Sequence, residues 1–167
     1  MTDSDDLLAR IRRRVVRPAT VRELQQTLRL PREQRRSFER RLKKLVASGT
    51  LVRIRGNRYG LPEKMNLIVG RVHINPRGFG FLTPESKNDF DQDIYISGTN
   101  LHQAMHGDRV MARIERRVQH ERTEGRIVRI LERRTTTLVA RYDSDESGLS
   151  FVVPFDRRII MDVHVPS

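Results

Sequence analysis

Three aromatic side chains in the middle of the chain could hold unpaired nucleic-acid bases. Phe79 and Phe81 stand in a Gly-Phe-Gly-Phe motif, and Tyr95 stands between two isoleucines. Residues two apart in a strand point to the same face, so both phenylalanines share one face, and Tyr95 joins them if the isoleucines are core. Arg71 and Arg77 lie nearby and would contact phosphates. The pattern predicts an RNA-binding platform formed by these five residues, because bases stack on aromatic rings whatever their sequence.

The alternative interpretation of these rings is structural, since phenylalanine and tyrosine in strands are more often buried. The whole chain has only six phenylalanines and three tyrosines, and three of these nine rings fall in two short motifs. This clustering favours a binding surface.

A second candidate surface is basic. Residues 1–62 hold 17 of the chain's 33 lysines and arginines but only 6 of its 21 acidic residues, so they carry almost all of the net charge of +12. Such a field attracts polyanions. The alternative is an ordinary solvated helix face. The predicted nucleic-acid contacts are the basic residues of one helix face and one hairpin: Arg32, Arg36, Arg40, Lys43, Lys44, Arg53, Arg55 and Arg58.

Three helices and a hairpin are expected to position these basic residues. Apolar residues at a spacing of four (Leu7, Ile11 and Val15) predict a first helix. Thr20 and Glu23 have the spacing of a capping box that begins a second helix. A third helix is expected from Pro31 to the Ser-Gly pair at residues 48–49.

Strands at 51–55 and 58–61 then flank a Gly-Asn turn that suits a tight hairpin. We therefore predict a winged helix-turn-helix over residues 1–62. Many such domains read duplex DNA, so this segment alone does not point to RNA.

From residue 63 the pattern changes to short strands. Five strands are expected within residues 63–132, namely 67–74, 77–82, 93–97, 109–114 and 125–131, which suits an OB-fold barrel. Residues 133–167 repeat the order of strand, glycine-containing turn, phenylalanine-bearing strand and third strand. They are predicted to be the truncated start of a second OB fold. The expected fold class is therefore α+β and multidomain: a winged helix-turn-helix, an all-β OB-fold barrel and an incomplete second OB fold.

Catalytic and metal-binding patterns are not recognised in the sequence. Asp89, Asp91 and Asp93 alternate as in an EF-hand, but Ile94 and Asn100 stand where that loop needs glycine and glutamate, so they are read as a charged loop. There is no cysteine, which removes disulfides and thiolate metal sites and fits a reducing cytoplasm. We predict no catalytic residue, no metal, no cofactor and no membrane partner for this chain.

The two aromatic motifs resemble the paired ribonucleoprotein motifs of cold-shock domains. The His-Gly-Asp-Arg-Val run at residues 106–110 resembles a turn and strand in the first cold-shock domain of the bacterial ribonuclease R family, within the RNase II/RNB enzymes. The run from Arg40 to Pro62 is similar to the helix-turn-helix that precedes it in that family. The resemblance covers essentially the whole chain, in the family's order.

The resemblance implies an RNA-binding N-terminal region of a 3′-to-5′ exoribonuclease. It would bind single-stranded RNA, or duplex RNA with a single-stranded tail, and feed it to a Mg²⁺-dependent catalytic domain that follows the cold-shock domains. Two alternatives stay open. One is a DNA-binding winged-helix regulator with an OB-fold partner domain, and the other is an OB-fold protein associated with the ribosome.

Overall fold

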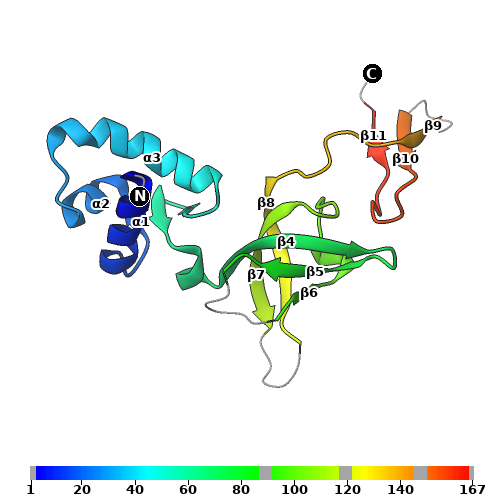
Figure 1. Cartoon of the computed structure of the whole chain (residues 1–167), viewed down its shortest axis with the longest axis horizontal. Helices are drawn as coiled ribbons and strands as arrows, with labels where there is room; N and C mark the ends of the chain where they lie inside the picture. The colour runs from blue at the N-terminus through cyan, green and yellow to red at the C-terminus, as the bar shows by residue number, and fades with distance from the viewer. Residues whose placement is uncertain (1–2, 87–91, 117–121, 145–149, 166–167) are drawn as a thin grey trace. The chain divides into compact units, whose positions relative to one another are not determined.

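The computed structural model describes residues 3–86, 92–116, 122–144 and 150–165. The chain forms two compact units, residues 1–67 and 68–167, which are described separately (Figure 1). Within the described residues no helix is both long and apolar enough to cross a membrane.

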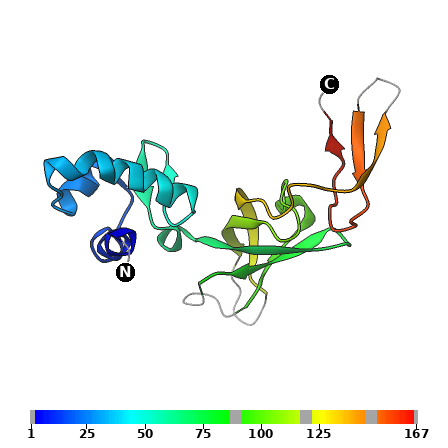
Figure 2. The ribbon, with the colours of Figure 1, turned by 45° about the horizontal axis from the view of Figure 1, so that its top comes forward.

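The first unit, coloured blue to cyan-green at the N-terminal end of the ribbon, has three helices among its described residues (Figure 2). They are joined by a small antiparallel sheet in the strand order β1-β3-β2. Its elements are α1 (Asp3–Arg14), β1 (Ala19–Thr20), α2 (Val21–Thr27), a 3₁₀ turn (Arg32–Gln34), α3 (Arg35–Ala47), β2 (Val52–Ile54), β3 (Arg58–Gly60) and a second 3₁₀ turn (Pro62–Met65).

The apolar spacing in the sequence determines which helix faces are buried. Leu7, Ile11 and Val15 are all buried in one core, together with Phe38 and Leu42 of α3. The capping box is present: Glu23 N–H donates to the Thr20 hydroxyl, and Thr20 N–H donates to the Glu23 carboxylate. These reciprocal bonds lower the pKa of Glu23, with the Thr20 backbone N–H as the largest cause.

Two local expectations need correction. Pro31 does not open α3; it precedes the 3₁₀ turn, and α3 begins at Arg35. The hairpin connection has three residues rather than two, because the last pair of the ladder is Ile54 with Arg58. Gly56 and Asn57 both have positive φ there, at 76° and 58°. The sequence therefore identified the two turn residues correctly, but the connection also includes Arg55, which is not paired in the ladder.

The barrel is formed by β4 (Leu67–Asn75), β5 (Phe79–Pro84), β6 (Ile94–Ile96), β7 (Arg109–Arg116) and β8 (Glu124–Glu132). It is closed in the order β4-β5-β6-β8-β7. The β6–β8 pair is parallel, whereas the β4–β5, β5–β6 and β7–β8 pairs are antiparallel. Alternate residues fill its core, including Val72, Leu82, Ile94 and Ile96. The predicted five-stranded OB barrel is confirmed.

A 3₁₀ turn (Gly98–Asn100) follows β6, and the last three strands form an antiparallel sheet in the order β11-β10-β9. The strands are β9 (Ala140–Ser144), β10 (Ser150–Pro154) and β11 (Val163–His164). The expected first strand began at Thr135, but residues 135–139 are outside the sheet, because the ladder with β10 starts at the pair Ala140 and Pro154. The Asp156 carboxylate accepts hydrogen bonds from Arg158, and that side chain lowers the pKa of Asp156 to about 2.

A buried carboxylate joins the two ends of the β7–β8 hairpin. Asp108 is fully buried at the start of β7, and its oxygens accept from Met105 N–H at 2.8 Å and Arg134 N–H at 3.0 Å. Arg133 Nη1 lies 2.7 Å from Asp108 Oδ2 and neutralises it. Asp108 thereby fixes the turn before β7 and the segment after β8.

We expect Asp108→Ala to destabilise the barrel by about 3 kcal/mol, because it leaves two backbone N–H donors unsatisfied and removes a charge-assisted pair. The measurement is amide hydrogen exchange at Leu82, which reports on the barrel core alone. Asp162→Ala, at an exposed position, is the control. Equal exchange rates in both variants would contradict a structural role for Asp108.

Candidate nucleic-acid interface

The three rings singled out in the sequence form one cluster on the outer face of the barrel. The Phe79 centroid lies 5.7 Å from the centroids of both Phe81 and Tyr95, and the Phe81 and Tyr95 centroids are 5.8 Å apart. Phe81 is 39% exposed, and the other two are half-buried. We call these three residues the aromatic platform.

Strand alternation and register place the platform. Ile94 and Ile96 are fully buried, so Tyr95 between them faces outward. Phe81 stands opposite Tyr95 across the β5–β6 ladder. Gly80 between the phenylalanines is buried, and a Cβ there would lie 3.1 Å from both the His73 carbonyl oxygen and the Leu101 side chain. A side chain at position 80 would therefore require its neighbours to move by a few tenths of an ångström.

The two predicted arginines lie on different parts of the barrel. Arg71 is exposed on β4, and its Nη1 donates to the Gly107 carbonyl at 3.1 Å. Arg77 is exposed in the β4–β5 turn, where its N–H donates to the Asn75 side chain at 2.9 Å. Gly78 in the same turn has a φ of +89°, which favours glycine.

Sequence reasoning missed Arg122. Its guanidinium carbon lies 3.9 Å from the centroid of the Tyr95 ring, a cation–π contact. It also forms an ion pair with Glu124 at 3.1 Å. The contact depends on the parallel pairing of β6 with β8, two strands far apart in the sequence, so no local sequence pattern predicts it.

A pair of histidines lies beside the platform. His73 is opposite Phe81 in the β4–β5 ladder, and its ring is 5.5 Å from that of His106 in an edge arrangement. Ile74 N–H donates to His106 Nδ1 at 3.1 Å, which requires the neutral imidazole. Burial, followed by the charge of Arg158, lowers the pKa of His106.

The eight predicted basic contacts are all exposed in the first unit. Arg36, Arg40, Lys43 and Lys44 lie on α3, and Arg32 lies in the 3₁₀ turn before it. The hairpin carries the others: Arg53 in β2, Arg55 in the turn and Arg58 in β3. Arg58 is partly engaged within the unit, because its Nη1 donates to the Pro18 carbonyl and lies 3.5 Å from Glu23.

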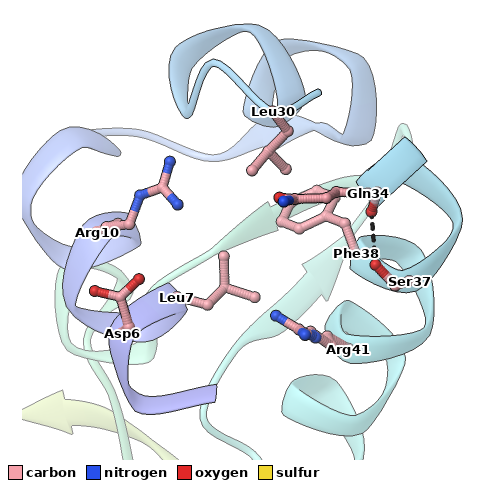
Figure 3. A pocket seen from close by; sticks show the side chains of 8 residues that line it. All are labelled: Asp6, Leu7, Arg10, Leu30, Gln34, Ser37, Phe38 and Arg41. Carbon is pink, nitrogen blue, oxygen red and sulfur yellow. Dashed lines mark hydrogen bonds between the residues drawn. The ribbon is translucent and has the colours of Figure 1, made fainter. Parts of the chain in front are cut away.

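A small hollow of about 150 Å³ lies between α1 and the start of α3 (Figure 3). Asp6, Arg10 and Arg41 line its polar side, and Leu7, Leu30 and Phe38 line its apolar side. Arg10 is held by the Leu28 carbonyl, and Ser37 by the Gln34 carbonyl at 2.8 Å. The Arg10 bond ties α1 to the end of α2, and the Ser37 bond is local to the start of α3, so we assign the hollow to packing of the unit.

The described residues bring together no group of three histidine or acidic side chains that would hold a metal ion. Of the carboxylates that resemble an EF-hand, Asp89 and Asp91 lie outside those residues.

Comparisons with known proteins agree with this architecture. Residues 70–130 match the sequence model of the family described as the ribonuclease B OB domain. The chain is 37% identical to ribonuclease R of Acidithiobacillus ferrooxidans over 143 residues, which is 86% of this chain and 32% of that protein. It is 38% identical to ribonuclease R of Escherichia coli K12 over 134 residues, 80% of this chain and 16% of that protein.

Among solved structures, yeast Ssd1, a pseudonuclease, has a TM-score of 0.50 at 16% identity, covering 62% of this chain and 18% of that one. That likeness concerns the fold alone. The sequence matches confirm the resemblance to the ribonuclease R family, and the chain spans at most about a third of the two curated relatives compared here.

The lowered pKa of His106 predicts that the stability of the barrel depends on pH. The folded chain keeps His106 neutral, whereas the unfolded chain takes up a proton below about pH 6.5. Stability therefore falls as the pH drops from 7 through 6.5 and on toward the lower folded pKa. NMR titration of the ring and amide exchange at Leu82 measure the two effects.

His106→Asn keeps a hydrogen-bond acceptor for Ile74 but cannot titrate, so it should remove this part of the pH dependence. A His106 ring that titrates at or above 6.5 would contradict the assignment.

Proposed function

We propose that this chain, whose barrel matches the ribonuclease B OB domain, is the RNA-binding N-terminal region of a ribonuclease R-like 3′-to-5′ exoribonuclease. The observation that carries the proposal is the aromatic platform: three rings within 6 Å of one another on the outside of an OB barrel, with a guanidinium over one of them. Flat, partly exposed rings beside arginines suit unpaired bases and their phosphates.

In this proposal the barrel holds single-stranded RNA. Bases stack on Phe79, Phe81 and Tyr95, while Arg71 and Arg77 contact phosphates. Such stacking contributes roughly 1–3 kcal/mol per base and is independent of sequence, which suits a protein that feeds many different RNAs to a nuclease.

The first unit is proposed to be a winged helix-turn-helix that grips structured or duplex RNA. Its order of helices followed by a hairpin, and the exposed basic face of α3, support this assignment. Recognition would depend on charge and shape, because side chains do not reach into the deep major groove of an RNA duplex. A regulator that reads duplex DNA would use the same helix, and only binding experiments separate the two.

The C-terminal sheet is proposed to be the beginning of a second OB fold. Its antiparallel strand order β11-β10-β9, with Phe151 on the middle strand, follows the pattern of β4, β5 and β6. The net charge of this segment is near zero, so we assign it a smaller part in RNA binding.

The nuclease reaction is assigned to a domain beyond these residues. Magnesium-dependent cleavage needs clustered carboxylates, and the described residues offer no such group. No step of the reaction is therefore placed in this chain. We also propose a cytoplasmic location, which the absence of cysteine from the sequence favours.

Phe79→Ala combined with Phe81→Ala should lower the affinity for single-stranded RNA at least about tenfold, because two stacking surfaces are lost. Both rings face outward, so the circular dichroism spectrum should be unchanged. Fluorescence anisotropy with a labelled oligoribonucleotide measures the affinity. The matched control is Phe155→Ala, which removes a ring that is 68% exposed outside the platform. Unchanged affinity in the double variant would overturn the platform.

Replacing Arg36, Arg40 and Lys43 with glutamine should weaken the salt dependence of binding to duplex RNA with a 3′ tail. Each lost phosphate contact lowers the slope of log K against log salt by about 0.9 for a duplex. The control replaces Arg12, Arg13 and Arg14 of α1, which removes the same charge from another helix. Equal slopes in the two triple variants would show that α3 has no specific contact. Tighter binding to one duplex DNA sequence than to either RNA would favour the regulator.

A further inference from the structure

A second basic surface lies on the barrel, outside the aromatic platform and outside the first unit. It is a shallow groove between the outer faces of β7 and β8 and the segment at residues 102–103. Arg113, Arg126, Arg129 and His102 line it together with the exposed Val128, and Ile130, which packs against the barrel core, adds apolar surface. We call it the β7–β8 groove.

The register of the strands concentrates positive charge in this groove. Arg113 stands directly opposite Arg126 in the antiparallel ladder. Like charges opposite each other destabilise a sheet, so their pairing here is unfavourable unless an anion lies over them. Glu115 relieves part of this repulsion by pairing with Arg126 at 2.8 Å. Among the described residues, the side chains of Arg113 and Arg129 have no ion-pair or hydrogen-bond partner.

A β-bulge shapes the floor of the groove. Ala112 pairs with Ile127 and the next residue back, Met111, pairs with Arg129, so Val128 is an extra residue in β8. Val128 and Arg129 are consequently both exposed, instead of alternating in and out. A bulge bends the strand and re-aims side chains, and bulges are common beside binding sites. Here it places an apolar side chain, 46% exposed, between arginines.

The groove continues from the platform along one strand. Tyr95 pairs with Glu124 of β8, and Arg126 follows two residues later on the same face, about 7 Å along the strand. Glu124 lies between them, but its charge is paired with Arg122 at 3.1 Å. Among the residues that the structure describes on this path, a strand of nucleic acid leaving Tyr95 therefore meets arginines and a carboxylate that is already paired.

We propose that the β7–β8 groove binds the phosphate backbone of the same single-stranded RNA that stacks on the platform. Arg113, Arg126 and Arg129 contact successive phosphates, and Val128 packs against a sugar or base. The groove lengthens the bound segment beyond the bases that the platform holds. This inference rests on the proposed RNA-binding function and assigns the path of the strand after Tyr95.

The first test compares RNAs of two lengths. Replacing Arg113 and Arg129 with glutamine should leave the affinity for an oligoribonucleotide of about four nucleotides unchanged, because the platform alone binds it. For about sixteen nucleotides, affinity should fall and the slope of log K against log salt should decrease by about 1.4, or about 0.7 for each lost phosphate contact. The matched control replaces Arg141 and Arg157, two exposed arginines outside the groove.

The two proposals fail in different ways. Unchanged binding of the longer RNA in the groove variant, with a loss in the Phe79→Ala, Phe81→Ala variant, would overturn the groove and leave the platform standing. An equal loss in the groove variant and the arginine control would also overturn it, because only net charge would matter. If the wild-type protein bound neither the short nor the long RNA, the proposed function itself would be overturned.

A second test uses the absence of cysteine from the chain. Val128→Cys introduces a unique thiol in the groove, and Val139→Cys introduces a control thiol at a position that is 76% exposed. The longer RNA should slow alkylation of the thiol at position 128 by iodoacetamide, and the shorter RNA should not. Protection by poly-glutamate but not by RNA would overturn the proposal in favour of an acidic peptide.

Discussion

The alternation of side chains in the closed barrel is the constraint on which the binding surfaces depend. Closure leaves one interior, and that interior is filled by residues such as Leu82, Ile94 and Ile96, none of which is exposed. Their neighbours in sequence therefore face outward. Phe81 and Tyr95 are brought together because the residues beside them are buried, so a one-residue slip of β6 would turn Tyr95 inward and put isoleucines on the surface.

The three rings proposed to stack lie together in the platform, whereas arginines lie both beside it and on other parts of the molecule. In the proposed function the rings of the platform bind by stacking, which depends little on salt, whereas α3 and the β7–β8 groove would bind through arginines and lysines whose contribution falls with ionic strength. Asp108 supports the barrel strands that carry the groove, since it ties the segment before β7 to the segment after β8.

Local patterns in the sequence were sufficient for much of the fold. The spacing of Leu7, Ile11 and Val15 predicted the first helix, because residues about four apart lie on the same face of a helix and are buried together. The capping box at Thr20 predicted the second helix, because the first backbone N–H groups of a helix need acceptors. The five barrel strands were located within a few residues. The strands at the C-terminal end were predicted less well, since residues 135–139 have β-forming side chains but precede the first pair of the ladder, Ala140 with Pro154. Phe155 N–H donates one further backbone hydrogen bond to the Val139 carbonyl.

Long-range pairing explains what sequence reasoning missed. Arg122 reaches Tyr95 only because β6 and β8 pair in parallel, and Arg113 faces Arg126 only because of their register, so neither neighbour is local in the sequence. The bulge at Val128 could not be predicted from the sequence, since the side chain of a valine in a strand usually points to the opposite face from those of its neighbours. The aromatic motif was visible because its two rings share one strand. The groove combines two strands and a distant turn, and so it emerges only from the folded barrel.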